Sequence, residues 1–115
     1  TIYEFEASTL ETVGTPFEGH TKLVNGLVLS FDCALLPSSS HDQIIKLWAF
    51  EAHQLLASFN VHNPEALIVS PDSCKLAYAI SAGGRDQWIC ICDTQSDVLA
   101  QARVRIPLTH SLVVC

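Results

Sequence analysis

The sequence predicts an all-β protein built from successive four-stranded antiparallel sheets. A period of 43 to 44 residues separates three similar segments, which centre on Phe5, Trp48 and Cys92. Within each period, short apolar stretches alternate with turn-forming residues, as expected of strands joined by tight turns. No long window has the 3.6-residue periodicity of an amphipathic helix. Because repeats of about 20 to 50 residues are typical of units that stack on one another, we expect the sheets to pack face to face.

Each period contains stretches that predict strands and residues that predict turns. In the first period, Asp32-Cys33 and His41-Asp42-Gln43 interrupt apolar stretches and therefore predict turns. The expected strands of this period are residues 24–30, 35–39, 44–50 and 54–60. The expected strands of the next period are residues 66–70, 75–80, 88–93 and 98–104. Each set of four predicts one antiparallel meander, and further strands are expected from the two ends.

The composition is that of a chain whose apolar surface needs cover. Hydrophobic residues make up 49% of the sequence and charged residues only 16%, whereas soluble domains average about 25% charged residues. A chain of 115 residues has a high ratio of surface to volume. The excess of apolar residues therefore predicts either a partner or an origin in a larger protein. Thr1 at the first position and the absence of methionine favour an excised or processed segment.

The distribution of charge argues against nucleic acid and membranes as partners. The net charge is −6, and the six cationic residues are spread along the chain, whereas nucleic-acid-binding surfaces usually carry a basic patch. No apolar run approaches the roughly 20 residues that span a bilayer. The N-terminal residues include Glu4 and Glu6 and no basic residue, so they do not resemble a secretory signal. We therefore expect the partners to be proteins.

The cysteines predict buried free thiols in a reducing, cytoplasmic compartment. Their number is odd, their neighbours are apolar strand residues, and their spacing matches no disulfide framework. The five residues are Cys33, Cys74, Cys90, Cys92 and Cys115.

Metal and cofactor sites are not expected. Cys90 and Cys92 would lie on one face of a strand, but zinc sites usually combine two closely spaced pairs of ligands. His41, His53 and His62 supply no second pair.

The segment from Gly19 to Trp48 resembles one repeat of the WD-repeat β-propeller family. The pair Gly19-His20 opens the segment and Trp48 closes it, without a gap in the pattern between them. A period of about 40 to 45 residues with these two ends is the signature of the family. The resemblance covers most of the chain and implies a partial β-propeller of four-stranded antiparallel blades. The segment departs from the pattern at Phe31, Cys33, Pro37 and Ala49.

The same resemblance divides the chain into four parts. Blade two is degenerate because Val61-His62 and Cys92-Asp93 replace the Gly-His and Trp-Asp pairs of the family. An excess of four residues is expected at 81–84. The expected parts are the last strands of a preceding blade (1–18), blade one (19–60), blade two (61–104), and the start of a next strand or a tail (105–115).

A finer resemblance concerns residues 15–21, which contain Pro16 and Gly19-His20. This segment is similar to the inter-blade segment of long fungal WD arrays. Those arrays often follow a nucleotide-binding signalling module, so the resemblance implies such a setting.

The family resemblance also implies a buried hydrogen-bond network of His20, Ser38, Asp42 and Trp48. The indole N–H can donate to the hydroxyl, the hydroxyl to one imidazole nitrogen, and the other imidazole N–H to the carboxylate. Each group is satisfied only when the others are present. We expect blade two to be less rigid, because its equivalent residues cannot form the same network. Those equivalents are His62, Tyr78, Asp86 and Cys92.

Catalysis is a remote alternative for the same residues. His20, Ser38 and Asp42 are the residue types of a hydrolytic triad. A triad needs an exposed nucleophile and an oxyanion hole, and the sequence has no Gly-x-Ser-x-Gly elbow. Gly83-Gly84 follows a strand but lacks the Lys-Ser/Thr and the helix of a phosphate-binding loop. We therefore expect the chain not to be an enzyme.

The expected function is a non-catalytic scaffold for protein–protein contacts, formed by a fragment of a propeller. Other proteins, or the remaining blades of a longer propeller, are the expected partners. The alternative is a small unit that completes a ring as a homo-oligomer, because blades close into rings that leave no sheet edge free. Blade faces and two loops are the expected contact surfaces. The loop residues are His41, Asp42 and Gln43 in one loop, and Ser81, Gly83, Gly84 and Arg85 in the other.

Overall fold

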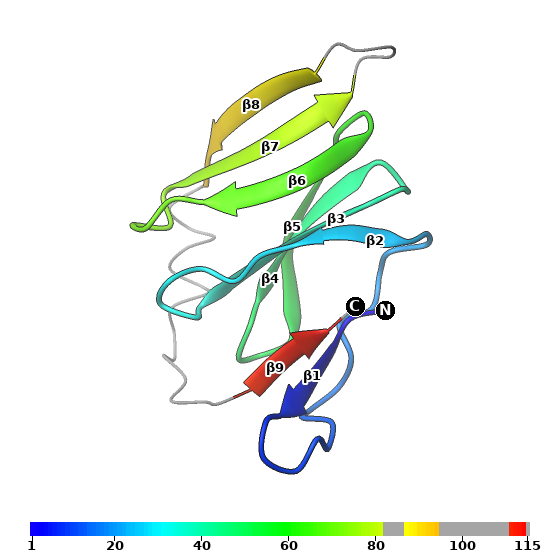
Figure 1. Ribbon diagram of the computed structural model, residues 1–115, viewed down its shortest axis with the longest axis vertical. Helices are drawn as coiled ribbons and strands as arrows, with labels where there is room; N and C mark the ends of the chain where they lie inside the picture. Colours follow the sequence, from blue (N-terminus) through cyan, green and yellow to red (C-terminus); the bar gives the residue numbers. More distant parts are fainter. Residues whose placement is uncertain (82–86, 95–110, 115) are drawn as a thin grey trace.

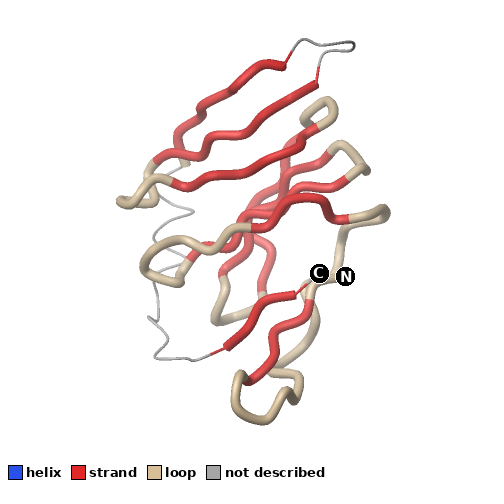
Figure 2. Tube along the Cα trace, in the orientation of Figure 1, coloured by secondary structure: helices blue, strands red, loops and turns tan. Residues whose placement is uncertain are grey.

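The computed structural model describes residues 1–81, 87–94 and 111–114, which form strands, turns and loops (Figures 1 and 2). Within these residues no helix is long and apolar enough to cross a membrane. The strands form three sheets that follow one another along the longest axis of the molecule (Figure 1). They are β1 (Tyr3–Glu6), β2 (Val24–Leu27), β3 (Leu35–Ser40), β4 (Ile44–Ala49), β5 (Gln54–Asn60), β6 (Pro64–Val69), β7 (Lys75–Ser81), β8 (Gln87–Asp93) and β9 (Ser111–Val114).

The central sheet, blade one, is a four-stranded antiparallel meander in the order β2-β3-β4-β5. Its strands match the four that the first period predicts to within one residue at each end, except that β2 ends at Leu27 and not at residue 30. The neighbouring strand β3 explains the difference, because Pro37 has no N–H to donate to the ladder. Beyond the pairing of Leu27 with Ser38, the Val28 N–H donates to the Pro37 carbonyl oxygen (3.2 Å).

The second sheet, blade two, contains β6, β7 and β8 in antiparallel order. It begins at Pro64, two residues before the expected start at residue 66. The expected fourth strand, at 98–104, lies outside the described residues. The all-β fold of antiparallel meanders is therefore confirmed, with four strands in blade one and three described strands in blade two.

The two blades begin their second strands with the same local turn. In blade one, the Ser30 hydroxyl donates to Asp32 (2.7 Å) and accepts from the Leu35 N–H (2.9 Å). In blade two, the Ser70 hydroxyl donates to Asp72 in the same way (2.6 Å). Short polar side chains of this kind satisfy the backbone groups of a turn without help from the rest of the fold.

The two ends of the chain lie side by side in a third sheet (Figure 1). β1 pairs with β9 in antiparallel register, from Tyr3 with Val114 to Glu6 with Ser111. Isolated bridges join Ile2 to Phe17 and Phe5 to Thr12, so residues 1–17 turn back on themselves. The sequence predicts a strand or a tail in residues 105–115, but it gives no sign that this strand returns to β1.

Two apolar clusters hold the sheets together. The first lies between blade one and blade two, and the second lies between blade one and the N-terminal segment. Both use alternate residues of the same strands, since successive side chains of a strand point to opposite faces. The first cluster has the core Ala34, Leu35, Ile45, Leu47, Val61 and Leu76. The second has the core Ile2, Phe17, Leu36, Trp48 and Phe50.

Candidate functional site

Four side chains of blade one form a continuous hydrogen-bond network. The Trp48 indole N–H donates to the Ser38 hydroxyl oxygen (2.9 Å), and Ser38 lies 2.7 Å from Nε2 of His20. Nδ1 of His20 lies 2.9 Å from the Asp42 carboxylate. Because Ser38 already accepts from the indole, its own proton is free to be donated to Nε2, which leaves Nδ1–H to donate to Asp42. The structure thus brings together the four residues that the family resemblance implies.

The network is buried and includes the start of β4. Ser38 is fully buried, and the side chains of His20 and Asp42 are 2% and 4% exposed. The Asp42 carboxylate also accepts from the N–H groups of Thr21 (3.0 Å) and Ile44 (3.1 Å). It therefore ties the loop before β2 to the turn between β3 and β4.

The hydrogen bonds of Asp42 outweigh the effect of burial on its acidity. Burial raises the pKa of the carboxyl, but the bonds from His20 and from the Thr21 amide lower it more, so that the pKa lies below its ordinary value. A carboxyl whose pKa is lowered by folding stabilises the folded state above its unfolded pKa of about 3.9. That contribution is lost as the pH falls through the lower pKa of the folded state.

We expect Asp42→Asn to have a lower free energy of unfolding than the wild type at pH 7. In acid this difference should disappear. The neutral amide keeps the shape of the side chain but cannot accept from three N–H groups as a carboxylate does. Urea unfolding of the wild type and of Asp42→Asn, at pH 7 and at about pH 3, would measure the free energies of unfolding. The free energies of unfolding should differ at pH 7 and converge at low pH, where the wild-type carboxylate becomes protonated. A difference that is the same at both pH values would contradict the assignment.

The residues of a hydrolytic triad are present, but their arrangement is unsuited to nucleophilic attack. Ser38 is fully buried and its hydroxyl oxygen already accepts from Trp48. A catalytic serine must reach its substrate and must face a site where an oxyanion can be bound. The geometry of His20, Ser38 and Asp42 satisfies buried polar groups and offers no exposed nucleophile.

The described equivalents in blade two, His62, Tyr78 and Cys92, do not repeat the bonds of the network with one another. His62 is exposed, and its ring contacts Gln43 (3.0 Å) and Asn63 (3.2 Å). Burial raises the pKa of Tyr78, and the nearby Cys90 and Cys92 thiols raise it further. Burial also raises the pKa of the Cys92 thiol, which keeps that sulfur protonated and unreactive at neutral pH. Asp86, the fourth equivalent, lies outside the described residues.

Of the two loops expected to bind partners, the structure places one residue elsewhere, and their binding stays a prediction. Ser81 is the last residue of β7 and pairs with Gln87, so it belongs to a strand and not to the loop. The expected loop residues Gly83, Gly84 and Arg85 lie outside the described part of the chain. In the first loop, Asp42 belongs to the buried network, so its carboxylate does not face a partner.

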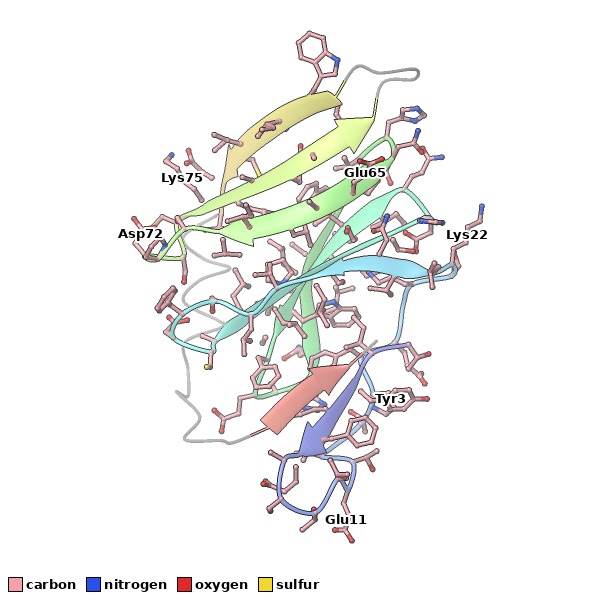
Figure 3. The ribbon with its side chains drawn as sticks, in the orientation of Figure 1. Tyr3, Glu11, Lys22, Glu65, Asp72 and Lys75 are labelled. Carbon is pink, nitrogen blue, oxygen red and sulfur yellow. The ribbon has the colours of Figure 1, made fainter. Side chains whose placement is uncertain are left out.

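The first loop lies beside a cleft at the junction of the two blades. His41 lines this cleft, which has a volume of about 470 Å³, together with Lys22, Asn25 and Glu65. The Asn25 amide donates to the Pro64 carbonyl oxygen (2.8 Å) and accepts from Ser39 (2.9 Å), which fixes one wall of the cleft. Lys22 and Glu65 are labelled in Figure 3.

Among the described residues, the outer face of blade two, on the side away from blade one, is apolar at its centre and uncovered, and the exposed ion pair of Lys75 and Asp93 lies at one end of it. Directly paired residues of an antiparallel sheet share a face, and the pairs of Ala77 with Ile68 and Ile91, and of Ala79 with Ile89, place these five side chains together. The exposed fractions of Ile68, Ile89 and Ile91 are 66%, 78% and 67%. We call this set of five residues the outer face.

In blade one, the positions equivalent to the outer face are covered by the next blade. One period of 44 residues separates Ile89 from Ile45 and Ile91 from Leu47. Ile45 and Leu47 are only 0% and 5% exposed, because they pack in the cluster between the blades. The period that relates these residues is visible in the sequence, but the sequence does not show which face of blade one is covered by blade two.

Within the described residues, no group of three or more His, Cys, Asp or Glu side chains is placed to hold a metal ion. The described cysteines are free thiols.

Comparisons with known proteins give one relative and a set of similar folds. No protein-family model matches the chain. The mouse protein "WD repeat-containing protein 18" is 33% identical to the chain over 66 residues, which are 55% of the chain and 15% of that protein. The chain therefore spans only a small part of this relative.

Two solved structures share the fold. A structure of U3-55K matches 70% of the chain and 26% of its own length, with a TM-score of 0.56 and 24% identity. The crystal structure of RRP9 WD40 repeats matches 55% of the chain and 21% of its own length, with a TM-score of 0.51 and 22% identity. The chain is thus similar in sequence to a WD-repeat protein, and its sheets have the fold of WD-type β-propeller blades.

Proposed function

We propose that the chain is a non-catalytic scaffold segment that binds another polypeptide through the outer face of blade two. The observation that carries this proposal is the exposure of Ile89 and Ile91 at positions whose equivalents in blade one are buried. Removing apolar surface from water stabilises a complex by about 25 cal/mol per Å² before the costs of association. A sheet face with three exposed isoleucines therefore favours a covered state.

The repeat indicates what kind of surface fits this face. Blade one is covered by side chains of β6, β7 and β8, which include Leu67, Val69, Tyr78 and Ile80. By the same period, the outer face fits a β-sheet with an apolar face of that type. The proposed partner is therefore another propeller blade, in the same protein or in another one.

Paired charge variants test this proposal. Ile89→Lys/Ile91→Lys places two charges on the outer face, and Leu10→Lys/Leu23→Lys places two charges at other exposed apolar positions, of 66% and 68% exposure. The immobilised chain would be used to capture polypeptides from its source cells, with circular dichroism as the check of folding. Capture of blade-containing proteins should be lost in the first variant and kept in the second. The same captured set for both variants would refute the outer face as the binding surface.

Self-association is the second candidate, and the pairing of β1 with β9 favours it. A strand that pairs with the other end of its own chain can make the same pairs with a second copy, as in domain swapping. Light scattering after size exclusion would then give a mass of two or more copies. A monomer at all concentrations would contradict this candidate and leave the first one standing.

The remaining parts of the proposal concern chemistry and setting. We propose that the chain catalyses no reaction, since its triad-like residues are buried, and that it uses no cofactor and binds neither nucleic acid nor membranes. Free cysteines among the described residues support a reducing, cytoplasmic location. The resemblance of residues 15–21 to fungal WD arrays supports a place beside a nucleotide-binding signalling module.

A further inference from the structure

A second apolar surface lies at the end of the molecule opposite to the outer face. Blade two lies at one end of the longest axis, and the sheet of β1 and β9 lies at the other (Figure 1). On β1, the ring of Tyr3 is 40% exposed, and its centroid lies 6.2 Å from that of the Phe5 ring. Alternate residues of a strand share one face of a sheet, so the two rings lie together. We call Tyr3 and Phe5 the N-terminal face.

The other side of β1 is turned toward blade one. Ile2 is fully buried in the cluster that the N-terminal segment shares with blade one. Glu4 is 4% exposed and contacts His53 in the turn between β4 and β5. The N-terminal face therefore points away from blade one, and Figure 3 shows Tyr3 at the end of the molecule away from blade two.

The repeat relates one residue of the outer face to two buried residues. Ile2, Ile45 and Ile89 stand one period apart, with separations of 43 and 44 residues. Ile2 and Ile45 are both 0% exposed, because each packs against the next sheet along the chain. Ile89 is 78% exposed. It stands at the position that a further sheet would cover.

The two junctions inside the chain show which kind of face provides the cover. Ile2 shares its cluster with the ring of Trp48, and Ile45 shares its cluster with the partly buried ring of Tyr78. In both junctions the later sheet thus presents a ring to the isoleucine of the earlier sheet. Phe5 stands one period before Trp48, so the N-terminal face is the corresponding side of the first sheet. The chain therefore leaves one face of each kind uncovered.

We propose that the outer face of one copy of the chain binds the N-terminal face of a second copy, so that copies associate head to tail. This pairing rests on the proposed function, because it names the partner of the same surface. A partner that covered only the outer face would leave Tyr3 exposed to water, whereas a second copy covers both kinds of face with one type of contact. Contacts between two different surfaces of one chain repeat from copy to copy, until a ring closes or a filament grows.

Two variants of the whole chain each disable one of the two faces. Ile89→Lys/Ile91→Lys places charges on the outer face, and Tyr3→Glu places a charge on the N-terminal face. Light scattering after size exclusion, over a range of concentrations, gives the mass, and circular dichroism checks the fold. We expect the wild type to have a mass of more than one copy that increases with concentration. Each variant alone should have a dissociation constant at least about 30-fold higher, as for changes at the centre of an interface.

Mixing the two variants tests the head-to-tail arrangement itself. One variant contributes an intact N-terminal face and the other an intact outer face, so an equal mixture should associate again. The complex should contain two copies and no more, because its remaining faces carry the substitutions. A mixture that stays monomeric while the wild type associates would overturn the proposal. Wild-type association of Tyr3→Glu alone would also overturn it, although the outer face could still be the binding surface.

Exchange of β1 and β9 between copies gives a different result, because it does not use the outer face. Association of Ile89→Lys/Ile91→Lys with wild-type strength would therefore overturn the head-to-tail arrangement. A wild-type chain that is monomeric at all concentrations would do the same, while capture of other blade-containing proteins through the outer face would still support the proposed function.

Two further variants guard against misfolding and against a general effect of charge. Tyr3→Ser removes the ring without adding a charge, and it replaces Tyr3→Glu in both experiments if that variant fails to fold. Leu23→Lys/Phe31→Lys adds two charges at positions of 68% and 83% exposure that belong to neither face. It should associate like the wild type. Loss of association in this control would overturn the assignment to the two faces.

Discussion

Replacing Trp48 by phenylalanine is expected to destabilise blade one by at least about 1–3 kcal/mol. The substitution removes the N–H that donates to Ser38 (2.9 Å), and loss of a buried hydrogen-bond partner has about this cost. It also removes part of an indole that is 2% exposed and packs edge-on against Phe17, with ring centroids 5.5 Å apart. The melting temperature should fall by roughly 4 °C for each kcal/mol.

Cys92→Ser is the matched control, because Cys92 stands one period after Trp48. Its side chain is half-buried and forms no counterpart of the tryptophan–serine bond among the described residues. We expect a smaller shift in melting temperature than for Trp48→Phe. Equal and negligible shifts in the two variants would count against the network as a source of stability.

Leu76→Ala is expected to cost about 2–5 kcal/mol and to weaken the contact between the two blades. Leu76 is fully buried. Leu76 and Val61 are the residues that blade two contributes to the core of the cluster shared with blade one. Truncating a buried leucine removes apolar contacts and leaves a cavity that the surrounding structure fills only in part. Chemical unfolding followed by circular dichroism would measure the loss.

Ile68→Ala provides the comparison on the opposite face of the same sheet. Ile68 is 66% exposed and lies on the outer face. Its truncation should change the stability of the isolated chain by less than about 1 kcal/mol, because little buried area is lost. A loss of stability as large as that of Leu76→Ala would mean that the outer face is already covered in the isolated chain.

The sequence predicted the strands of blade one well because that period carries its signals locally. Turn residues and apolar stretches mark each strand, and the family resemblance of the segment from Gly19 to Trp48 supplies the partners of the network. The end of β2 was missed, because it depends on Pro37 in the neighbouring strand and not on the residues of β2 themselves. Pairing between strands is a property of two segments at once.

Blade faces were expected as contact surfaces, but the contact of Glu4 with His53 and the residues of the outer face could not be predicted, for a related reason. Glu4 and His53 are 49 residues apart, and nothing in the residues around either one indicates the other. Whether the outer face is buried depends on a neighbouring blade. The alternation of apolar residues along β8 is the same with or without that neighbour. Ser81 was assigned to a loop because the excess residues of the repeat can be placed at several positions, and β7 extends further than the family pattern suggests.

The turns at Ser30 and Ser70 have a consequence for the way in which the chain folds. Each turn closes a ring of only a few residues, so the entropy lost on closure is small, and its side-chain bonds need no distant partner. The hairpins β2–β3 and β6–β7 can therefore form within each repeat before the sheets meet. Contacts between residues close in the sequence form fast, whereas the pairing of β1 with β9 must wait for the two chain ends to find each other. The slow step of folding would then be the closure of the ends, with the hairpins already in their native register.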